Sequence, residues 1–349
     1  MKMFSARFFF ILLMIPVLVV SAAEDCSGDS GYDGRDRVEA SKFKAIAAIG
    51  ILVAGILGVF FPNIGKKFPM FRTDSNMFFL VKAFAAGVIL ATGFIHVLPD
   101  AFETLGSPCL PEKPWSKFPF PAFVAMVAAL CTMMVDLFAT SYFRKAQLDN
   151  KPKPVDEESP AQPHAQVPIH THATHGHAHG SVEPYSGSDL TRRRVISLVL
   201  EIGIIVHSII IGISLGASVD VDTIKPLLIA LTFHQLFEGM GLGGCIAEAQ
   251  YAARATILMA IFFCFTTPIG IAIGFGISGI YNENSPTALI VEGLLNSTSA
   301  GILIYMALVD LIAADFMSDR LQRNLKLQIG ANISLLLGAG LMSLLAIWA

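Results

Sequence analysis

The chain has 349 residues, of which 54% are hydrophobic and only 15% are charged, and its mean hydropathy is +0.64. This composition argues against a soluble globular domain and favours a membrane protein with several spans. The formal net charge of −3 argues against a nucleic-acid-binding protein, which would need a basic surface.

The first 23 residues have the layout of a cleavable secretory signal. Lys2 and Arg7 precede an apolar run, which ends in small residues before Glu24. An uncleaved first span is the alternative, and in both cases the chain enters the secretory membrane system. Residues 24–42 are then expected to form an extracellular segment.

Two of the five cysteines, Cys26 and Cys109, lie in polar segments. If both face the lumen or the exterior, these two cysteines are able to form a disulfide. Because no CxxC occurs in the sequence, a thiolate zinc knuckle is excluded.

Eight stretches after the signal are long and apolar enough to cross a bilayer, since a span needs about 20 mostly apolar residues. The predicted fold class is therefore an all-α integral membrane protein with eight transmembrane helices. The fourth and fifth stretches are the least purely apolar because they contain Glu201, His207, His234 and Glu238. The predicted spans are residues 43–62, 77–99, 120–143, 195–218, 224–246, 254–280, 286–312 and 326–348.

One long loop divides the spans into two groups. Residues 144–194 are rich in Pro, Glu, Ser and His and show no apolar periodicity, so we expect a disordered cytoplasmic loop. It separates spans one to three, within 43–143, from spans four to eight, within 195–349. Lys and Arg are concentrated in this loop and in 63–76, so the positive-inside rule places both termini outside.

The same loop contains the histidine-rich run IHTHATHGHAHG. Clustered imidazoles in a flexible segment bind Zn²⁺ loosely, and this binding should weaken below about pH 6.5. We expect the run to sense or buffer arriving metal without forming the path itself, and a fortuitous solvated tract is the alternative. The histidines concerned are His164, His170, His172, His175, His177 and His179.

The fifth span carries an imidazole and a carboxylate, His234 and Glu238, one helical turn apart on one face, where both can meet one cation. Burying an ionised carboxylate in a membrane is costly, so such a group normally faces a cavity or a partner. His207, with Ser208 beside it, lies at a matching depth if spans four and five are antiparallel. We therefore expect His207, His234 and Glu238 to converge near mid-membrane, and three separate helix-packing residues are the alternative.

The second span ends in GFIHVLPDAFE, in which His96 and Asp100 are one turn apart and Glu103 follows near the outer edge. We interpret these three residues as a metal entrance that attracts cations at the outer face. An ordinary polar helix end is the alternative. Pro99 is able to loosen the helix at this point.

Glycines accompany the polar residues of spans four and five. Gly212 and Gly216 form a small-xxx-small step, and four more glycines occupy the inner half of span five. Small residues let helix backbones approach closely, and they also leave room for a cavity beside the ligands.

These motifs resemble the ZIP (Zrt-, Irt-like) family of divalent-metal transporters, in its plant form. The resemblance covers nearly all of the chain beyond the signal. It implies a 3+2+3 arrangement, in which two inverted three-span repeats enclose spans four and five, and metal movement into the cytoplasm. It is carried by HSIIIGISLG, FHQLFEGMGLGGC, GFIHVLPDAF, SPTALIVEGLLNSTSAGILIYMALVDL and the His-rich loop.

The resemblance also implies site residues. It implies metal ligands at His207, His234 and Glu238, and it places Ser208 and Gln235, which are adjacent to them in the motifs, in the same transport site. Some family members carry a second acidic ligand four residues after the histidine of span four, and here that position is Ile211. We therefore expect one main transport site.

The resulting hypothesis is a transporter of Zn²⁺, and also of Fe²⁺, Mn²⁺ or Cd²⁺, in the cell membrane, with a vacuolar or other endomembrane location as the alternative. We expect no resident cofactor and no nucleotide partner, since the sequence has no GxxxxGK[ST]; a homodimer is compatible with the sequence. An intramembrane zinc metalloenzyme is the alternative function, disfavoured by the absence of HExxH. A metal sensor that does not transport is a second alternative.

Overall fold

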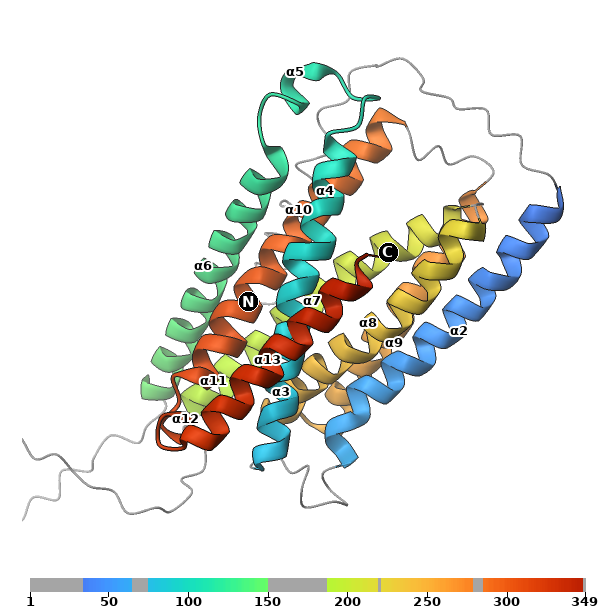
Figure 1. Cartoon of the computed structure of the whole chain (residues 1–349). Coiled ribbons are helices and arrows are strands. Elements are labelled where there is room, and N and C mark those ends of the chain that lie inside the picture. The colour runs from blue at the N-terminus through green and yellow to red at the C-terminus, as the bar shows by residue number, and fades with distance from the viewer. Residues whose placement is uncertain (1–33, 65–74, 150–186, 219–220, 279–284, 348–349) are drawn as a thin grey trace, which may run out of the picture.

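The computed structural model describes residues 34–64, 75–149, 187–218, 221–278 and 285–347 (Figure 1). Within these ranges every regular element is helical and none is a strand, as the all-α prediction requires. The predicted signal, the histidine-rich run and Cys26 lie outside the described residues.

Eight long helical stretches make up the described part of the bundle. Two of them are composite, because a π-helical segment interrupts the α-helix: α3 (Asn76–Ala91) continues through η3 (Thr92–Val97) into α4 (Leu98–Leu105), and α10 (Pro286–Tyr305) continues through η4 (Met306–Ala313) into α11 (Ala314–Phe316). The other long helices are α2 (Gly34–Ile64), α6 (Phe120–Asp149), α7 (Gly187–Ala217), α8 (Val221–Glu248), α9 (Ala253–Ile277) and α13 (Leu325–Leu345). Two short helices, α5 (Glu112–Trp115) and α12 (Asp319–Gln322), lie in connections.

Seven of the described stretches are long and apolar enough to be candidate membrane spans. α8, which corresponds to the predicted fifth span, has 28 residues but is not among the seven, because polar residues such as His234, Gln235 and Glu238 reduce its mean hydropathy. The bundle exposes large apolar side chains, including Ile49 at 64%, Phe138 at 74% and Leu336 at 70%. A surface of this kind suits contact with lipid tails and not with water, so the chain is a multi-pass membrane protein.

Several helices extend beyond the predicted spans. α6 continues through Asp149 and α7 begins at Gly187, so both ends of the predicted loop 144–194 are helical. In the same way α2 begins at Gly34, inside the predicted extracellular segment. Hydropathy marks where a helix enters lipid, whereas a helix already formed continues through polar residues that favour it, such as Arg, Lys and Gln.

Four pairs of closely packed helices organise the bundle: α2 with α8, α7 with α9, α3 with α13, and α6 with α10 (Figure 1). Glycines lie at all four of these close approaches, and two of them serve as examples. A Cβ atom added to Gly212 of α7 would lie 2.6 Å from the carbonyl oxygen of Thr267 in α9, and one added to Gly58 of α2 would lie 3.0 Å from Cα of Gly239 in α8. The predicted close packing at Gly212 is confirmed, and these glycines make room for a neighbouring backbone.

Candidate metal site

Three buried histidines from three different helical segments meet inside the bundle: His96 of η3, His207 of α7 and His234 of α8. Their ring centroids are 5.4 Å apart for His207 and His234, 5.7 Å for His96 and His234, and 5.9 Å for His96 and His207. The exposed fractions of the three residues are 5%, 2% and 3%, in chain order. The cluster is therefore almost entirely removed from solvent.

Glu238 adds a carboxylate to this cluster. It is fully buried, and its Oε1 lies 3.2 Å from Nε2 of His234. This is a close polar contact but not a hydrogen bond, because neither atom has a hydrogen-bond partner within the described residues. The same is true of other atoms of the cluster, so that seven of its buried polar atoms have no hydrogen-bond partner among the described residues. They are Nε2 of His96, Nδ1 and Nε2 of His207, Nδ1 and Nε2 of His234, and Oε1 and Oε2 of Glu238.

The local sequence explains why His96 reaches the cluster. Pro99 has no backbone N–H, so the carbonyl of Ile95 cannot receive the regular α-helical hydrogen bond. Immediately before this point the helix widens into the π-segment η3, which contains His96. Such π-segments change the direction in which their side chains point and are common at functional sites.

The histidine–carboxylate pair of α8 faces α7 because the two helices are neighbours joined by a short connection. α7 ends at Ala217 and α8 begins at Val221, so the chain reverses direction within a few residues. The structure thus brings together the three residues predicted to lie at one depth, namely His207, His234 and Glu238. It also adds His96, which the sequence had assigned to the entrance.

Two residues adjacent to the ligands in the motifs have different surroundings. The side-chain amide of Gln235 donates a hydrogen bond from Nε2 to the carbonyl of Phe263 at 3.3 Å, and its Oε1 accepts one from the hydroxyl of Thr267 at 3.3 Å. Gln235 therefore ties α8 to α9. Ser208 is 2% exposed and follows His207 by one residue, which places it about 100° further around α7.

A cavity of about 380 Å³ lies beside His96, at the end of the bundle that is predicted to face outside. The predicted entrance residues His96, Asp100 and Glu103 all line it, and His96 is the one member of the cluster that does. Glu292 of α10 lines the same cavity. The sequence did not assign Glu292 to the entrance, although an acidic residue inside an apolar span is a signal for a functional site.

The spacing of the rings agrees with ligands that share one ion. An imidazole centroid lies roughly 3 Å from a metal bound at about 2.1 Å, so two rings on one ion have centroids roughly 5–6 Å apart. Nevertheless, no group of three His, Cys, Asp or Glu residues in the described chain is already assembled as a metal site. The convergence of the rings is the informative feature, since an ion that must arrive and leave requires an open site and not a closed tetrahedral one.

A multi-pass bundle with histidines and a carboxylate clustered in its interior, beside an acidic cavity, has the features of membrane proteins that transport ions. The family model described as ZIP Zinc transporter matches residues 41–346. The chain therefore belongs to the ZIP family, as its motifs predicted.

Several relatives are similar over almost their whole length. "Zinc transporter 8" of Oryza sativa subsp. japonica is 53% identical, with 93% of this chain and 92% of the relative covered. "Zinc transporter 3" of Arabidopsis thaliana is 50% identical, with coverage of 98% and 97%. "Fe(2+) transport protein 1" of Oryza sativa subsp. japonica is 48% identical, with coverage of 96% and 93%.

Proposed function

We propose that this protein transports divalent metal cations, zinc foremost, into the cytoplasm, and that His96, His207, His234 and Glu238 bind the ion midway. The observation that carries the proposal is the set of seven nitrogen and oxygen atoms in one buried cluster that have no hydrogen-bond partner among the described residues. Each buried polar group without a partner costs about 1–3 kcal/mol. A passing cation would supply the missing partner to several of them at once.

The chemistry of the donors supports zinc and its neighbours in the first transition row. Imidazole nitrogen suits zinc, iron and similar ions, and a carboxylate adds one negative charge. Relatives named as zinc transporters and as an Fe(2+) transport protein support the same range of cargo. Because the ion is cargo, no resident metal or cofactor and no enzymatic step form part of the proposal.

The outer cavity is suited to the capture of cations. Asp100, Glu103 and Glu292 line its walls and His96 lines it beside the cluster. Acidic side chains in a cleft with low-dielectric walls concentrate cations near the site. Ile211 also lines this cavity, four residues after His207, so one main transport site is the simplest interpretation.

We further propose eight spans in a 3+2+3 arrangement, with α8 as the fifth span. The helix pairs support this order. If α2 is exchanged with α9, α3 with α10, α6 with α13 and α7 with α8, each of the four close pairs becomes another of the four. The π-segments support it too, since η3 and η4 interrupt the two spans that the exchange relates. Repeats of three spans have opposite directions in the membrane, as inverted transporter repeats require.

The remaining parts of the proposal rest on the sequence. Residues 1–23 would be a removed signal, 24–42 would begin outside, and 144–194 would be cytoplasmic. The run 164–179 would bind metal loosely in a regulatory role, so its deletion should leave substantial transport. A plasma-membrane location and a homodimer complete this picture.

Purified protein in sealed vesicles would test the transport proposal. We expect zinc added outside to reach a zinc-sensitive dye inside, and His207→Ala to abolish this flux while the variant still inserts. Flux at the wild-type level in His207→Ala would refute the assignment of this residue. Zinc binding without flux in the wild type would favour the sensor, and zinc-dependent turnover of a buried bond would favour the metalloenzyme.

A further inference from the structure

The three helices that carry the histidines meet a second time toward the predicted inner end. Lys82 precedes His96 by 14 residues (96 − 82), Arg193 precedes His207 by 14 (207 − 193), and Glu248 follows His234 by 14 (248 − 234). Fourteen residues are close to four helical turns, so each residue lies near the face of its helix that carries the histidine, roughly 21 Å along the axis. The seam between the helices therefore has a histidine cluster at one level and a charged cluster at another.

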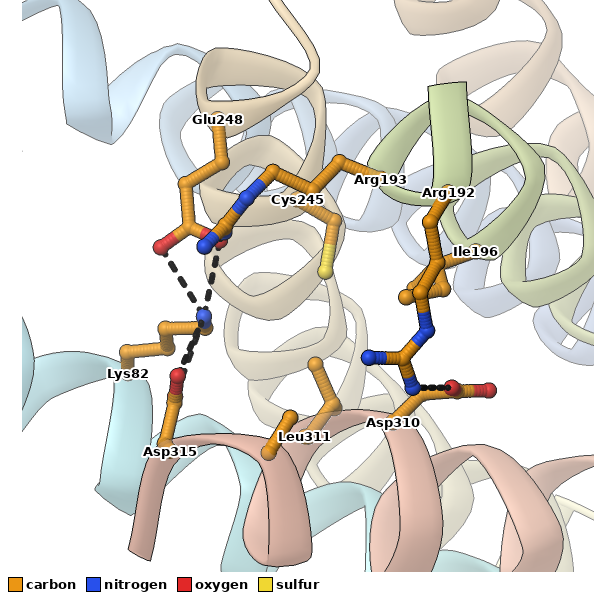
Figure 2. Close-up of a pocket in the computed structure, with 10 residues that line it drawn as sticks. Lys82, Arg192, Arg193, Ile196, Cys245, Glu248, Asp310, Leu311 and Asp315 are labelled. Carbon is orange, nitrogen blue, oxygen red and sulfur yellow. Dashed lines mark hydrogen bonds and ion pairs between the residues drawn. The ribbon is translucent and has the colours of Figure 1, made fainter. Parts of the chain in front are cut away.

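The charged cluster is a buried network of ion pairs, shown in Figure 2. The ammonium of Lys82 lies 2.8 Å from both carboxylate oxygens of Glu248 and 3.0 Å from Asp315 of α11. The guanidinium of Arg193 donates to the same carboxylate of Glu248. The Lys82 side chain is only 7% exposed. These ion pairs thus connect four helical segments.

Between the two levels each of the three helices buries apolar side chains. Ile89, Leu200, Ile204 and Leu242 are all fully buried and belong to one hydrophobic cluster. The pocket at the charged network has a volume of about 130 Å³, and none of its lining residues lines the outer cavity. The histidine cluster therefore borders the outer cavity through His96, whereas none of its members lines the inner pocket.

We propose that Lys82, Arg193, Glu248 and Asp315 are the inner gate of the transport path. This inference rests on the proposed function, because it takes the seam below the histidines as the exit route. In the closed gate the ion pairs hold α3, α7, α8 and α11 together, and in the open gate the pairs separate and an ion leaves between them.

Charged residues are suited to this role at the edge of the bundle. Separating two packed apolar faces exposes apolar surface to water, and nothing compensates for this cost. When an ion pair separates, each charged group gains hydrogen bonds to water in place of its partner. The desolvation cost of a buried pair offsets much of its attraction, so the paired and hydrated arrangements lie close in free energy. Two discrete arrangements of similar free energy are what a gate requires.

A native thiol reports on this gate. Cys245 lines the same pocket and is 4% exposed, so its alkylation should be slow while the gate is closed. The full-length protein in membranes would be treated with N-ethylmaleimide, and modification of each cysteine followed by mass spectrometry. We expect Glu248→Gln and Asp315→Asn to raise the alkylation rate of Cys245 by roughly ten- to a hundredfold, as when a hydrogen bond to a charged group stops holding the closed state.

Two controls accompany the measurement. Cys264 of α9 is 2% exposed and is not among the residues that line the pocket, so its alkylation rate should stay unchanged. Asp319→Asn removes an acidic group at the same end of the bundle, where the Asp319 side chain is 87% exposed and 3.9 Å from Arg323. In this variant the alkylation of Cys245 should remain slow.

Unchanged alkylation of Cys245 in both variants would overturn the proposal. A parallel rise at Cys264 would overturn it as well, since that pattern reports general loosening. If Glu248→Gln fails to reach the membrane, Asp315→Asn carries the test, because it keeps the pair between Lys82 and Glu248. The assay requires no metal flux, so its outcome is separate from that of the His207→Ala experiment.

Discussion

His96 and His234 have ring centroids 5.7 Å apart, although 138 positions (234 − 96) separate them in the chain. His96 also lines the outer cavity together with Asp100. One side chain therefore belongs both to the entrance and to the buried cluster. Under the proposed function, His96 is the point at which a captured ion would pass from the cavity to the buried ligands.

The double position of His96 predicts a specific kinetic difference from its neighbour Asp100. His96→Ala should lower the maximal rate of zinc uptake at least about tenfold, because the loss of a group that supports a metal typically costs ten- to a hundredfold. Asp100→Asn should mainly raise the zinc concentration for half-maximal uptake, since it weakens capture only. Zinc uptake measured across concentrations in cells that lack their own transporters would separate the two effects. If His96→Ala behaved like Asp100→Asn, His96 would be an entrance residue alone.

Glu238 provides a prediction on stability that does not depend on transport. Glu238→Gln keeps the shape of the side chain but removes its charge, so the variant should bind zinc weakly. A ligand at 100 times its dissociation constant stabilises a protein by about 2.7 kcal/mol. We expect zinc to raise the melting temperature of the wild-type protein in detergent, but not that of Glu238→Gln.

The matched control for this measurement is Ser208→Ala, which changes a residue that is equally buried, at 2% exposure, and about 100° from His207 around the helix. It should retain the stabilisation by zinc. Equal stabilisation of Glu238→Gln and the wild type would remove Glu238 from the set of ligands.

The close approach of α7 and α9 predicts which glycine tolerates a side chain. Gly212→Ala would place a Cβ 2.6 Å from the Thr267 carbonyl oxygen, whereas a Cβ added to Gly276 would have nothing within 4 Å. Overpacking of this kind costs about 1–3 kcal/mol. Thermal unfolding in detergent should therefore show a lower midpoint for Gly212→Ala and little change for Gly276→Ala. Equal midpoints would mean that the two helices separate without cost.

The parts of the site that follow from local geometry could be predicted from the sequence. His234 and Glu238 share a helix face because they are one turn apart, and His207 meets them because a short connection makes α7 and α8 neighbours. Gln235 shows that a residue next to a ligand in a sequence motif need not share the ligand's surroundings. It stands beside His234 in the sequence, yet one step along a helix turns its side chain to α9, where it bonds Phe263 and Thr267.

The long-range parts of the structure could not be predicted in this way. His96 joins the cluster through a π-segment and through the packing of η3 against α10, neither of which has a periodic signal in the sequence. Lys82 near a span end is typical of a snorkelling side chain, but it is 7% exposed and paired with Glu248, 166 positions away. Hydropathy likewise does not rank α8 among the candidate spans, because the residues that define the site are polar.

Ile211 offers a gain-of-function test of the single transport site. It lines the outer cavity four residues after His207, so Ile211→Asp would place a carboxylate one helical turn from that imidazole. A further anionic ligand should bind the ion more tightly and release it more slowly. Zinc uptake should therefore show a lower half-maximal concentration together with a lower maximal rate. Ile211→Asn introduces a side chain of nearly the same shape as Ile211→Asp but without charge, so it should change both parameters less. If Ile211→Asp left both parameters at the wild-type values, the cavity wall at this position would lie off the path of the ion.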